Sequence, residues 1–336
     1  EEPAQPEEPA QSEEPAEVSE TPEFTPAEFR IAALKGPTAM GLVELMSLSD
    51  TANEMMEGKE NVVSTGNTYE FTLAGSADEV TPALIKGDLD MACVPANLAA
   101  VLYGKTDGAV EVLAVNTLGV LYIVENGETV QSMADLKGQT IVAAGKGSTP
   151  EYALRYLLTE NGIDPDKDVT IDWKSEHSEC VASLASGAAT IAMLPQPFVT
   201  VAQTQLPDLR VALDLTEEWD KTQPENGSSL VTGVTVCRKE VLEQNPEAAE
   251  LFVKEHGESA EWVNANVTDA AELVAAAGII EKAPIAAKAI PYCSIVCIDG
   301  EDMKTRLSGY LEALYEMEPS AVGGQMPDDG FYYLHE

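Results

Sequence analysis

The 336-residue sequence is poor in basic groups, with 19 lysines and arginines against 58 aspartates and glutamates and a net charge of −39 at pH 7. So few cations cannot neutralise a run of phosphates, which excludes nucleic acid as a partner. No stretch approaches the ~20 consecutive apolar residues that cross a bilayer. Histidine is scarce too, with three copies, and no HExxH, Ser-His-Asp order or catalytic carboxylate pair emerges. The sequence therefore predicts no catalytic residues.

The cysteines show no metal-binding or disulfide pattern. The five of them form no CxxC pair and no zinc-type spacing. Cys293 and Cys297 would lie roughly 13 Å apart along one strand, at ~3.3 Å per residue, which is too far for a disulfide. In "SEHSEC", His177 and Cys180 fall on one helical turn with Glu176. The corresponding "SADEVT" is an ordinary acidic helix start, which favours a structural role. We expect free thiols, no metal and no cofactor.

Residues 1–28 differ in composition from the rest of the chain. They hold ten acidic residues, six prolines and no lysine or arginine. Such a segment repels itself and has almost nothing to bury, so it should be extended and disordered. A simple solubility tail and a stalk that holds the folded body away from a surface both fit this composition.

From residue 30 onward, continuous apolar runs alternate with helical patterns, which predicts mainly parallel sheets covered on both faces by helices. Residues 84–101 also match residues 184–201 at an offset of one hundred. The match aligns Leu84, Gly87, Ala92, Pro95 and Val101 with Leu184, Gly187, Ala192, Pro195 and Val201. Each segment predicts a helix, a glycine stop, a buried strand, a proline and a second helix. We infer two lobes of one architecture.

The motif "GKGSTP" at 145–150 resembles a phosphate loop but fails its pattern. Gly147 separates Lys146 from Ser148, whereas G-x-x-x-x-G-K-[ST] needs lysine directly before the hydroxyl residue. Pro150 also stands where a dinucleotide fingerprint needs its third glycine. Thr149 suits a helix N-cap and Pro150 the first helical position. The motif therefore predicts a turn from a strand into a helix.

Turns of this kind still form binding sites, because ligands of parallel sheets lie beyond the carboxyl ends of the strands, where helix N-termini present N–H groups. Two facing lobes would direct four such turns, at 35–38, 95–97, 146–149 and 195–198, into one cleft. With hinge-proximal threonines added, the predicted ligand-binding residues are Lys35, Thr38, Asn97, Thr117, Gly147, Ser148, Thr149, Gln196, Phe198 and Thr232.

Three longer segments carry a family resemblance. "SMADLKGQTIVAAGKGSTPEYALRYLLTENGI", "LASGAATIAMLPQPFV" and "GVTVCRKEVLEQNPEAAELFVKEHGESAEWVNAN" resemble ABC-transporter solute-binding proteins of the two-lobed periplasmic-binding fold. The similarity is to the nitrate, sulfonate, taurine and thiamine-precursor branch, and it runs from about residue 30 to about residue 315.

The resemblance implies an α/β fold of two Rossmann-like lobes, with hinge crossings near 116–119 and within 214–232. Lobe one would comprise 29–117 and 231–336, and lobe two 118–230. It further implies a monomer that closes on a small solute, docks on a membrane permease and lies outside the cell membrane. The acidic stalk would then be a tether, with a lipid-bearing cysteine just before residue 1.

The sequence leaves the solute and two other functions open. Helix N-termini, with Lys35 and Lys146, favour an anionic group, but none of the four turns carries an arginine to bind a small anion bidentately. A neutral or weakly anionic organic solute, such as a heterocycle or a sulfonate, fits this balance. An enzyme on the same fold, related to pyrimidine synthases or menaquinone-pathway proteins, and a solute-sensing domain are the alternatives.

Overall fold

Short buried strands form two separate sheets in the computed structural model, which describes residues 25–56, 66–223 and 227–334. Within these residues the larger sheet has six strands in the order β11-β4-β10-β3-β1-β2. They are β1 (Glu28–Leu34), β2 (Thr68–Ala74), β3 (Met91–Pro95), β4 (Val110–Thr117), β10 (Gly233–Arg238) and β11 (Ile295–Ile298). The smaller sheet has five strands in the order β7-β6-β8-β5-β9. They are β5 (Leu121–Glu125), β6 (Thr140–Ala144), β7 (Thr170–Lys174), β8 (Ile191–Pro195) and β9 (Arg210–Asp214).

The two sheets repeat one topology, which confirms the inferred duplication. In the larger sheet β1 pairs in parallel with β2 and β3, and β10 lies antiparallel between β3 and β4. In the smaller sheet β6 pairs in parallel with β7 and β8, and β5 lies antiparallel between β8 and β9. The matched segments contain β3 and β8, which occupy the same place in their sheets. Strands β1–β4 and β6–β9 run in one direction within their sheets, as predicted, and the reversed strands β10 and β5 add antiparallel pairs.

Helices connect and cover the strands. Those of the first half are α1 (Pro37–Met40), α2 (Val43–Met56), α3 (Ala77–Lys86), α4 (Ala96–Lys105) and the 3-10 turn η1 (Met133–Leu136). The smaller sheet carries α5 (Thr149–Glu160), α6 (His177–Ala185), α7 (Phe198–Gln205) and α8 (Leu215–Thr222). After β10 come α9 (Lys239–Gln244), α10 (Pro246–Ala265), α11 (Val267–Ala276), α12 (Ala283–Ala289), η2 (Ile290–Tyr292), α13 (Gly300–Met317), η3 (Pro319–Val322) and η4 (Asp329–Phe331).

Alternate residues of each strand enter different cores, as expected for sheets covered on both faces. In β6, Ile141 and Ala143 face one core while Val142 and Ala144 face another. The core that contains Ile141 continues into the larger lobe, through Trp219 of α8 and Tyr310 of α13. Their ring centroids lie 5.3 Å apart. The apolar contact between the lobes is therefore part of the folded core.

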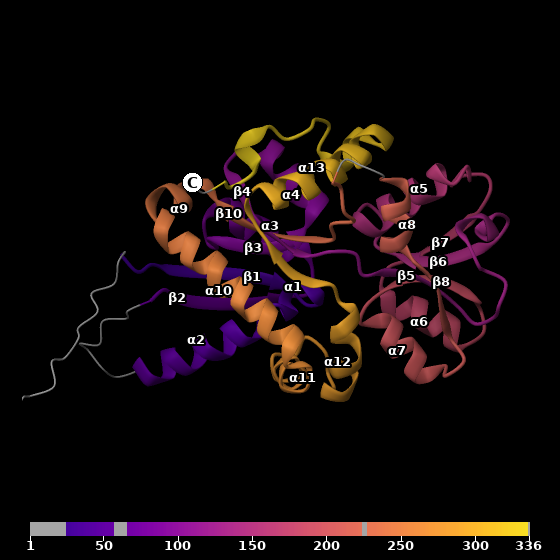
Figure 1. The fold of residues 1–336 in the computed structure, drawn as a ribbon, viewed down its shortest axis with the longest axis horizontal. Helices are drawn as coiled ribbons and strands as arrows, with labels where there is room; N and C mark the ends of the chain where they lie inside the picture. Colours follow the sequence, from indigo (N-terminus) through magenta and orange to yellow (C-terminus); the bar gives the residue numbers. More distant parts are fainter. Residues whose placement is uncertain (1–24, 57–65, 224–226, 335–336) are drawn as a thin grey trace, which may run out of the picture.

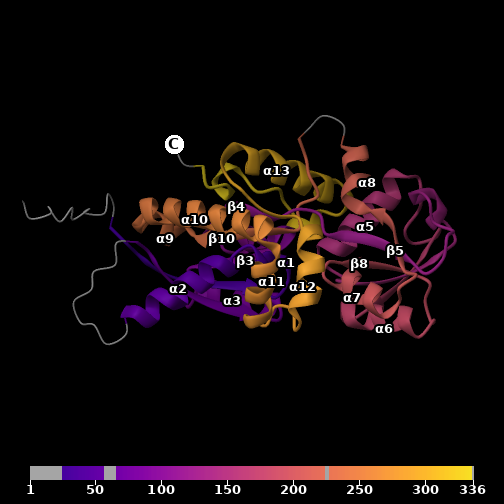
Figure 2. The same ribbon diagram turned by 60° about the horizontal axis from the view of Figure 1, so that its bottom comes forward.

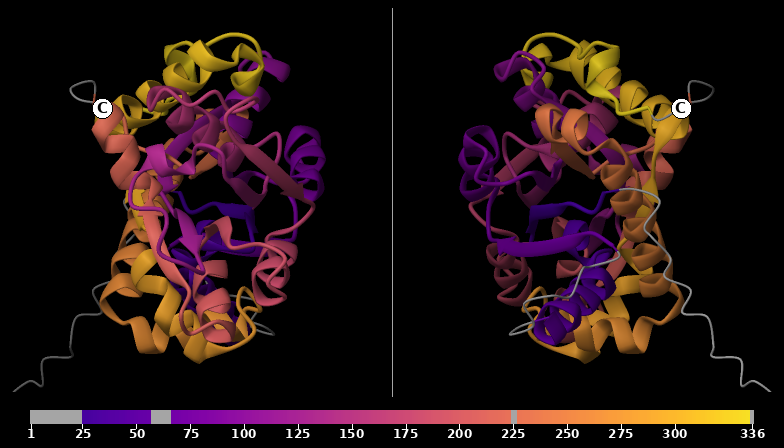
Figure 3. Two further views of the ribbon diagram at one scale, coloured as in Figure 1. Left: turned by 90° about the vertical axis from the view of Figure 1, so that its right-hand side faces the viewer. Right: turned by 90° about the vertical axis from the view of Figure 1, so that its left-hand side faces the viewer.

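The lobes lie side by side and are bridged twice (Figure 1). On one side α13 packs against α5, and on the other α12 packs against α7. Figure 2 shows α13 and α8 together on one face, and both views of Figure 3 place the yellow C-terminal segment opposite the orange α11–α12 segment. The chain passes between the sheets at 118–120 and again at 215–232. We keep 29–117 with 231–336, and 118–230, as proposed lobe boundaries.

The expected tether lies almost entirely outside the described residues, since residues 1–24 are not among them. Its last predicted residue, Glu28, is the first residue of β1. No helix in the described ranges is long and apolar enough to cross a membrane. All five cysteines are free thiols, and four of them are buried.

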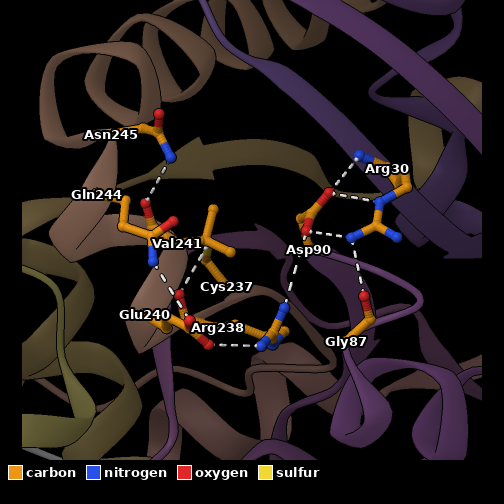
Figure 4. Close-up of polar contacts among 9 residues, drawn as sticks. All are labelled: Arg30, Gly87, Asp90, Cys237, Arg238, Glu240, Val241, Gln244 and Asn245. Carbon is orange, nitrogen blue, oxygen red and sulfur yellow. Dashed lines mark hydrogen bonds and ion pairs between the residues drawn. The ribbon is translucent and has the colours of Figure 1, made fainter.

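An ion-pair cluster lies at the edge of the larger sheet where strands β1 and β3 begin (Figure 4). Asp90 accepts hydrogen bonds from the backbone N–H of Arg30 and from its guanidinium, at 2.7–2.9 Å. Arg238, from the end of the reversed strand β10, approaches the same carboxylate at 4.0 Å. Gly87 has φ +83°, a left-handed conformation that favours glycine over other residues. This edge is opposite to the one where strands β1 and β3 end.

Candidate ligand-binding site

A cavity of about 380 Å³ lies between the lobes. From the larger sheet, the lining includes residues just after β1 and the last residues of β3 and β4. From the smaller sheet, it includes residues after β6 and β7 and the last residue of β8. The reversed strands reach the same edges, with Thr232 just before β10 and Leu121 at the start of β5. Parallel strands point their carboxyl ends to one edge, which explains why these separate segments converge.

The wall from lobe one is built on the turn between β1 and α1. Leu34, Lys35, Gly36, Pro37 and Thr38 all line the cavity. Gly36 has φ +145°, a backbone conformation that residues other than glycine rarely adopt. The chain can therefore turn sharply from the buried strand into Pro37, the first residue of α1.

The wall from lobe two carries the aromatic rings. Phe198, at the start of α7, packs against His177, at the start of α6, with ring centroids 5.2 Å apart and planes 41° apart. His177 Nδ1 is buried and has no hydrogen-bond partner among the described residues. Burial lowers the pKa of His177 to about 4. The imidazole is therefore neutral at physiological pH.

Most predicted site residues meet at this cavity. Those that line it are Lys35, Thr38, Thr117, Ser148, Thr149, Gln196, Phe198 and Thr232. Helix α5 begins at Thr149 with Ser148 as N-cap, one residue earlier than predicted. Lys35 is exposed at the edge of the cavity.

Asn97 and Gly147, which were predicted with the other eight, are not among the residues that line the cavity. The Gly147 N–H donates to Glu151 Oε2 at 2.7 Å on the surface. Lys146 lines a different hollow, with Tyr152 and Trp173. The reason is local, because Gly145 and Gly147 both have positive φ, and the single side chain between them, Lys146, lies at that other hollow.

Asn97 instead connects the lobes behind the cavity wall. Its side chain is 5% exposed, its Nδ2 donates to Ala321 O at 3.3 Å, and its Oδ1 accepts from Thr149 Oγ1 at 3.2 Å. Thr149 belongs to lobe two and Ala321 to the C-terminal segment. Asn97 is therefore a positioning residue for Thr149.

Sequence reasoning missed His177 and Ile279, which both line the cavity. His177 follows β7, so the rule that directed attention to the four turns could have found it. Ile279 comes from the loop between α11 and α12 and carries no local signal. Among the described residues that line the cavity, Lys35 and His177 are the titratable groups, and there is no carboxylate and no arginine.

With this geometry in place, comparison with known proteins identifies the family. Residues 60–241 match the family model described as ABC transporter, phosphonate, periplasmic substrate-binding protein. The chain belongs to this family. A relative from Brucella abortus, named only as a binding protein, is 26% identical over 209 residues, which cover 62% of this chain and 61% of that protein. The chain thus matches less than two thirds of the length of this curated relative.

Solved structures show the fold of this substrate-binding family. An ABC transporter protein from Parabacteroides distasonis has a TM-score of 0.75 at 20% identity, and the match covers 92% of this chain and 99% of that one. The periplasmic aliphatic sulphonate binding protein SsuA from Escherichia coli has a TM-score of 0.69 at 16% identity, with 89% and 96% covered. These matches confirm the two-lobed periplasmic-binding fold.

Proposed function

We propose that this protein is the solute-binding component of an ABC importer and that it binds a small organic solute in the cavity between its lobes. The observation that carries the proposal is the convergence of both sheets' carboxyl edges on one cavity of about 380 Å³. This is the size of a small-molecule site. Membership of the substrate-binding family supports the same function.

In this proposal the lobes close about the two chain passages at 118–120 and 215–232. The closed monomer then delivers its solute to a membrane permease. The acidic segment at the start of the chain would tether it outside the membrane through a lipid-bearing cysteine. We propose binding without a reaction, because the matching family model describes substrate-binding proteins and the described residues of the cavity lining include no carboxylate to pair with His177.

Thermal-shift screening against small organic acids, amides, ring compounds, alkanesulfonates and phosphonates tests the proposal. A bound solute at one hundred times its dissociation constant adds ~2.7 kcal/mol of stability, so a true ligand raises the melting temperature measurably. Small-angle scattering of the same complex should show a smaller radius of gyration than the free protein. An unchanged radius at saturation would refute hinge closure.

A matched pair of variants locates the site. Ser148→Phe fills the cavity at the N-cap of α5 and should abolish binding. Ser76→Phe places the same side chain at the N-cap of α3, where the serine is exposed and outside the cavity, and should bind as the parent does. Equal binding by both variants would exclude this cavity as the site.

A further inference from the structure

The partly exposed hydroxyl groups of the cavity direct their protons away from it. Thr38 Oγ1 donates to Leu34 O at 2.9 Å, and Ser148 Oγ donates to Gly145 O at 2.8 Å. Thr232 Oγ1 donates to Leu118 O at 2.7 Å. A carbonyl oxygen can only accept, so the hydroxyl must be the donor in each pair. Since a hydroxyl has one proton and each of these protons is already bonded, the three oxygens are placed to accept hydrogen bonds from a solute.

The two buried hydroxyls of the wall behave alike. Thr117 Oγ1 donates to Asn116 Oδ1 at 3.0 Å, and Thr149 Oγ1 donates to Asn97 Oδ1 at 3.2 Å. The amide nitrogens of both asparagines donate elsewhere, to Thr235 and Ala321. Their oxygens therefore face the threonines, and the direction of both hydrogen bonds is fixed.

Proline removes backbone donors from the same walls. Pro37 and Pro150 occupy the first turns of α1 and α5, and Pro95 and Pro197 are the N-caps of α4 and α7. Proline has no N–H. The N–H of Ser148 is also used, since it donates to Gly145 O at 3.2 Å. The helix N-termini thus present fewer donors than four complete helix starts would.

An oxyanion needs the opposite arrangement. A phosphonate or sulfonate has oxygens that accept hydrogen bonds, and proteins bind such groups with arginine forks or clusters of N–H donors. Among the described residues the cavity instead offers hydroxyl acceptors, one lysine, the side-chain amide of Gln196, no arginine, and a pair of rings formed by His177 and Phe198. The oxygen of that amide accepts from Thr200, so its NH₂ group is a single neutral donor group.

We propose that the solute is a planar organic molecule that donates N–H hydrogen bonds to the hydroxyl oxygens of Thr38, Ser148 and Thr232, such as a cyclic amide, and that it is not a phosphonate or sulfonate. This inference rests on the proposed function and specifies its substrate class. The ring of such a solute would pack on Phe198, and its amide N–H groups would satisfy the free lone pairs of the wall.

Calorimetric titration of the full chain with three matched probe sets tests the inference. Uracil and hydantoin supply ring N–H donors, 1,3-dimethyluracil and 1,3-dimethylhydantoin keep the rings without those donors, and methylphosphonate and methanesulfonate supply oxyanions. We expect at least one N–H probe to bind, and its dimethyl counterpart to bind at least tenfold more weakly, because lost hydrogen bonds leave wall acceptors unpaired.

Ser148→Ala should weaken binding of the N–H probe about tenfold, while Ser76→Ala, at the exposed N-cap of α3, should leave it unchanged. Tighter binding of either oxyanion than of both N–H probes would overturn the inference and leave the proposed function standing. Equal binding of methylated and unmethylated rings would overturn it as well. If no probe of any set binds, the inference is rejected, while the proposed function is rejected only if the wider thermal-shift screen also finds no ligand.

Discussion

The buried side chain of Asn97 offers the sharpest test of how the lobes are held together. It bonds Ala321 O and Thr149 Oγ1, and the side chains at both ends of the inter-lobe bond are buried, with Asn97 5% and Thr149 1% exposed. Asn97→Ala removes both hydrogen bonds and leaves a buried hydroxyl and a backbone carbonyl without those partners. Each lost partner costs about 1–3 kcal/mol, so we expect the free energy of unfolding to fall by about 3 kcal/mol.

Guanidinium denaturation of the unliganded protein measures this loss. Asn161→Ala is the matched control, because Asn161 is exposed and bonds only its own helix, to Leu157 O at 2.8 Å. We expect it to cost less than about 1 kcal/mol. A cycle with Thr149→Val isolates the inter-lobe bond and should give a coupling energy of about 1 kcal/mol.

Two results would refute this reasoning. The first is a loss in Asn97→Ala no larger than that in Asn161→Ala. The second is a coupling energy of zero between Asn97 and Thr149, which would mean that the bond contributes nothing to the contact between the lobes. The sequence alone suggests the opposite outcome, a weakened ligand response with unchanged stability, because it places Asn97 in the cavity wall.

Three further predictions concern other parts of the molecule. His256 is fully buried, and burial lowers its pKa to about 4 from 6.5. Protonation of His256 therefore destabilises the fold, and stability is lost as the pH falls from 6.5 towards 4. His256→Gln should remove roughly 3 kcal/mol of this pH dependence, measured by denaturation at stepped pH, and an unchanged slope would contradict the prediction. Asp90→Ala should lower the free energy of unfolding by about 2 kcal/mol, because it leaves Arg30 and Arg238 facing each other. This is less than the cost of breaking a fully buried ion pair, because Arg30 is partly exposed to solvent. Calorimetry should show an unchanged solute affinity, and a weakened affinity would contradict a purely structural role for the cluster. Trp219 packs at the inter-lobe contact, so a solute-induced change in fluorescence should disappear in Trp219→Phe while calorimetric binding persists; a signal that survives the substitution must come from another tryptophan.

The local elements could be predicted from the sequence because their signals lie within a few residues. Gly87 and Gly187 have positive φ and follow the ends of equivalent helices, and Pro95 and Pro195 are the last residues of equivalent strands. The offset of one hundred between the two segments was sufficient to infer two lobes of one topology. The reversed strands β5 and β10 could not be read in this way, since an apolar run does not state which neighbour it pairs with or in which direction.

The sequence by itself determined that two related halves present polar strand-to-helix turns, and it predicted that these turns form a binding site. Tertiary structure alone decided which of them line the cavity. It placed Asn97 behind the wall and His177 in it, and it brought Ile279 to the cavity from a distant loop. The physical reason is that periodicity fixes the face of a local element, whereas the partner of each hydroxyl proton depends on residues up to 114 positions away, as between Thr232 and Leu118.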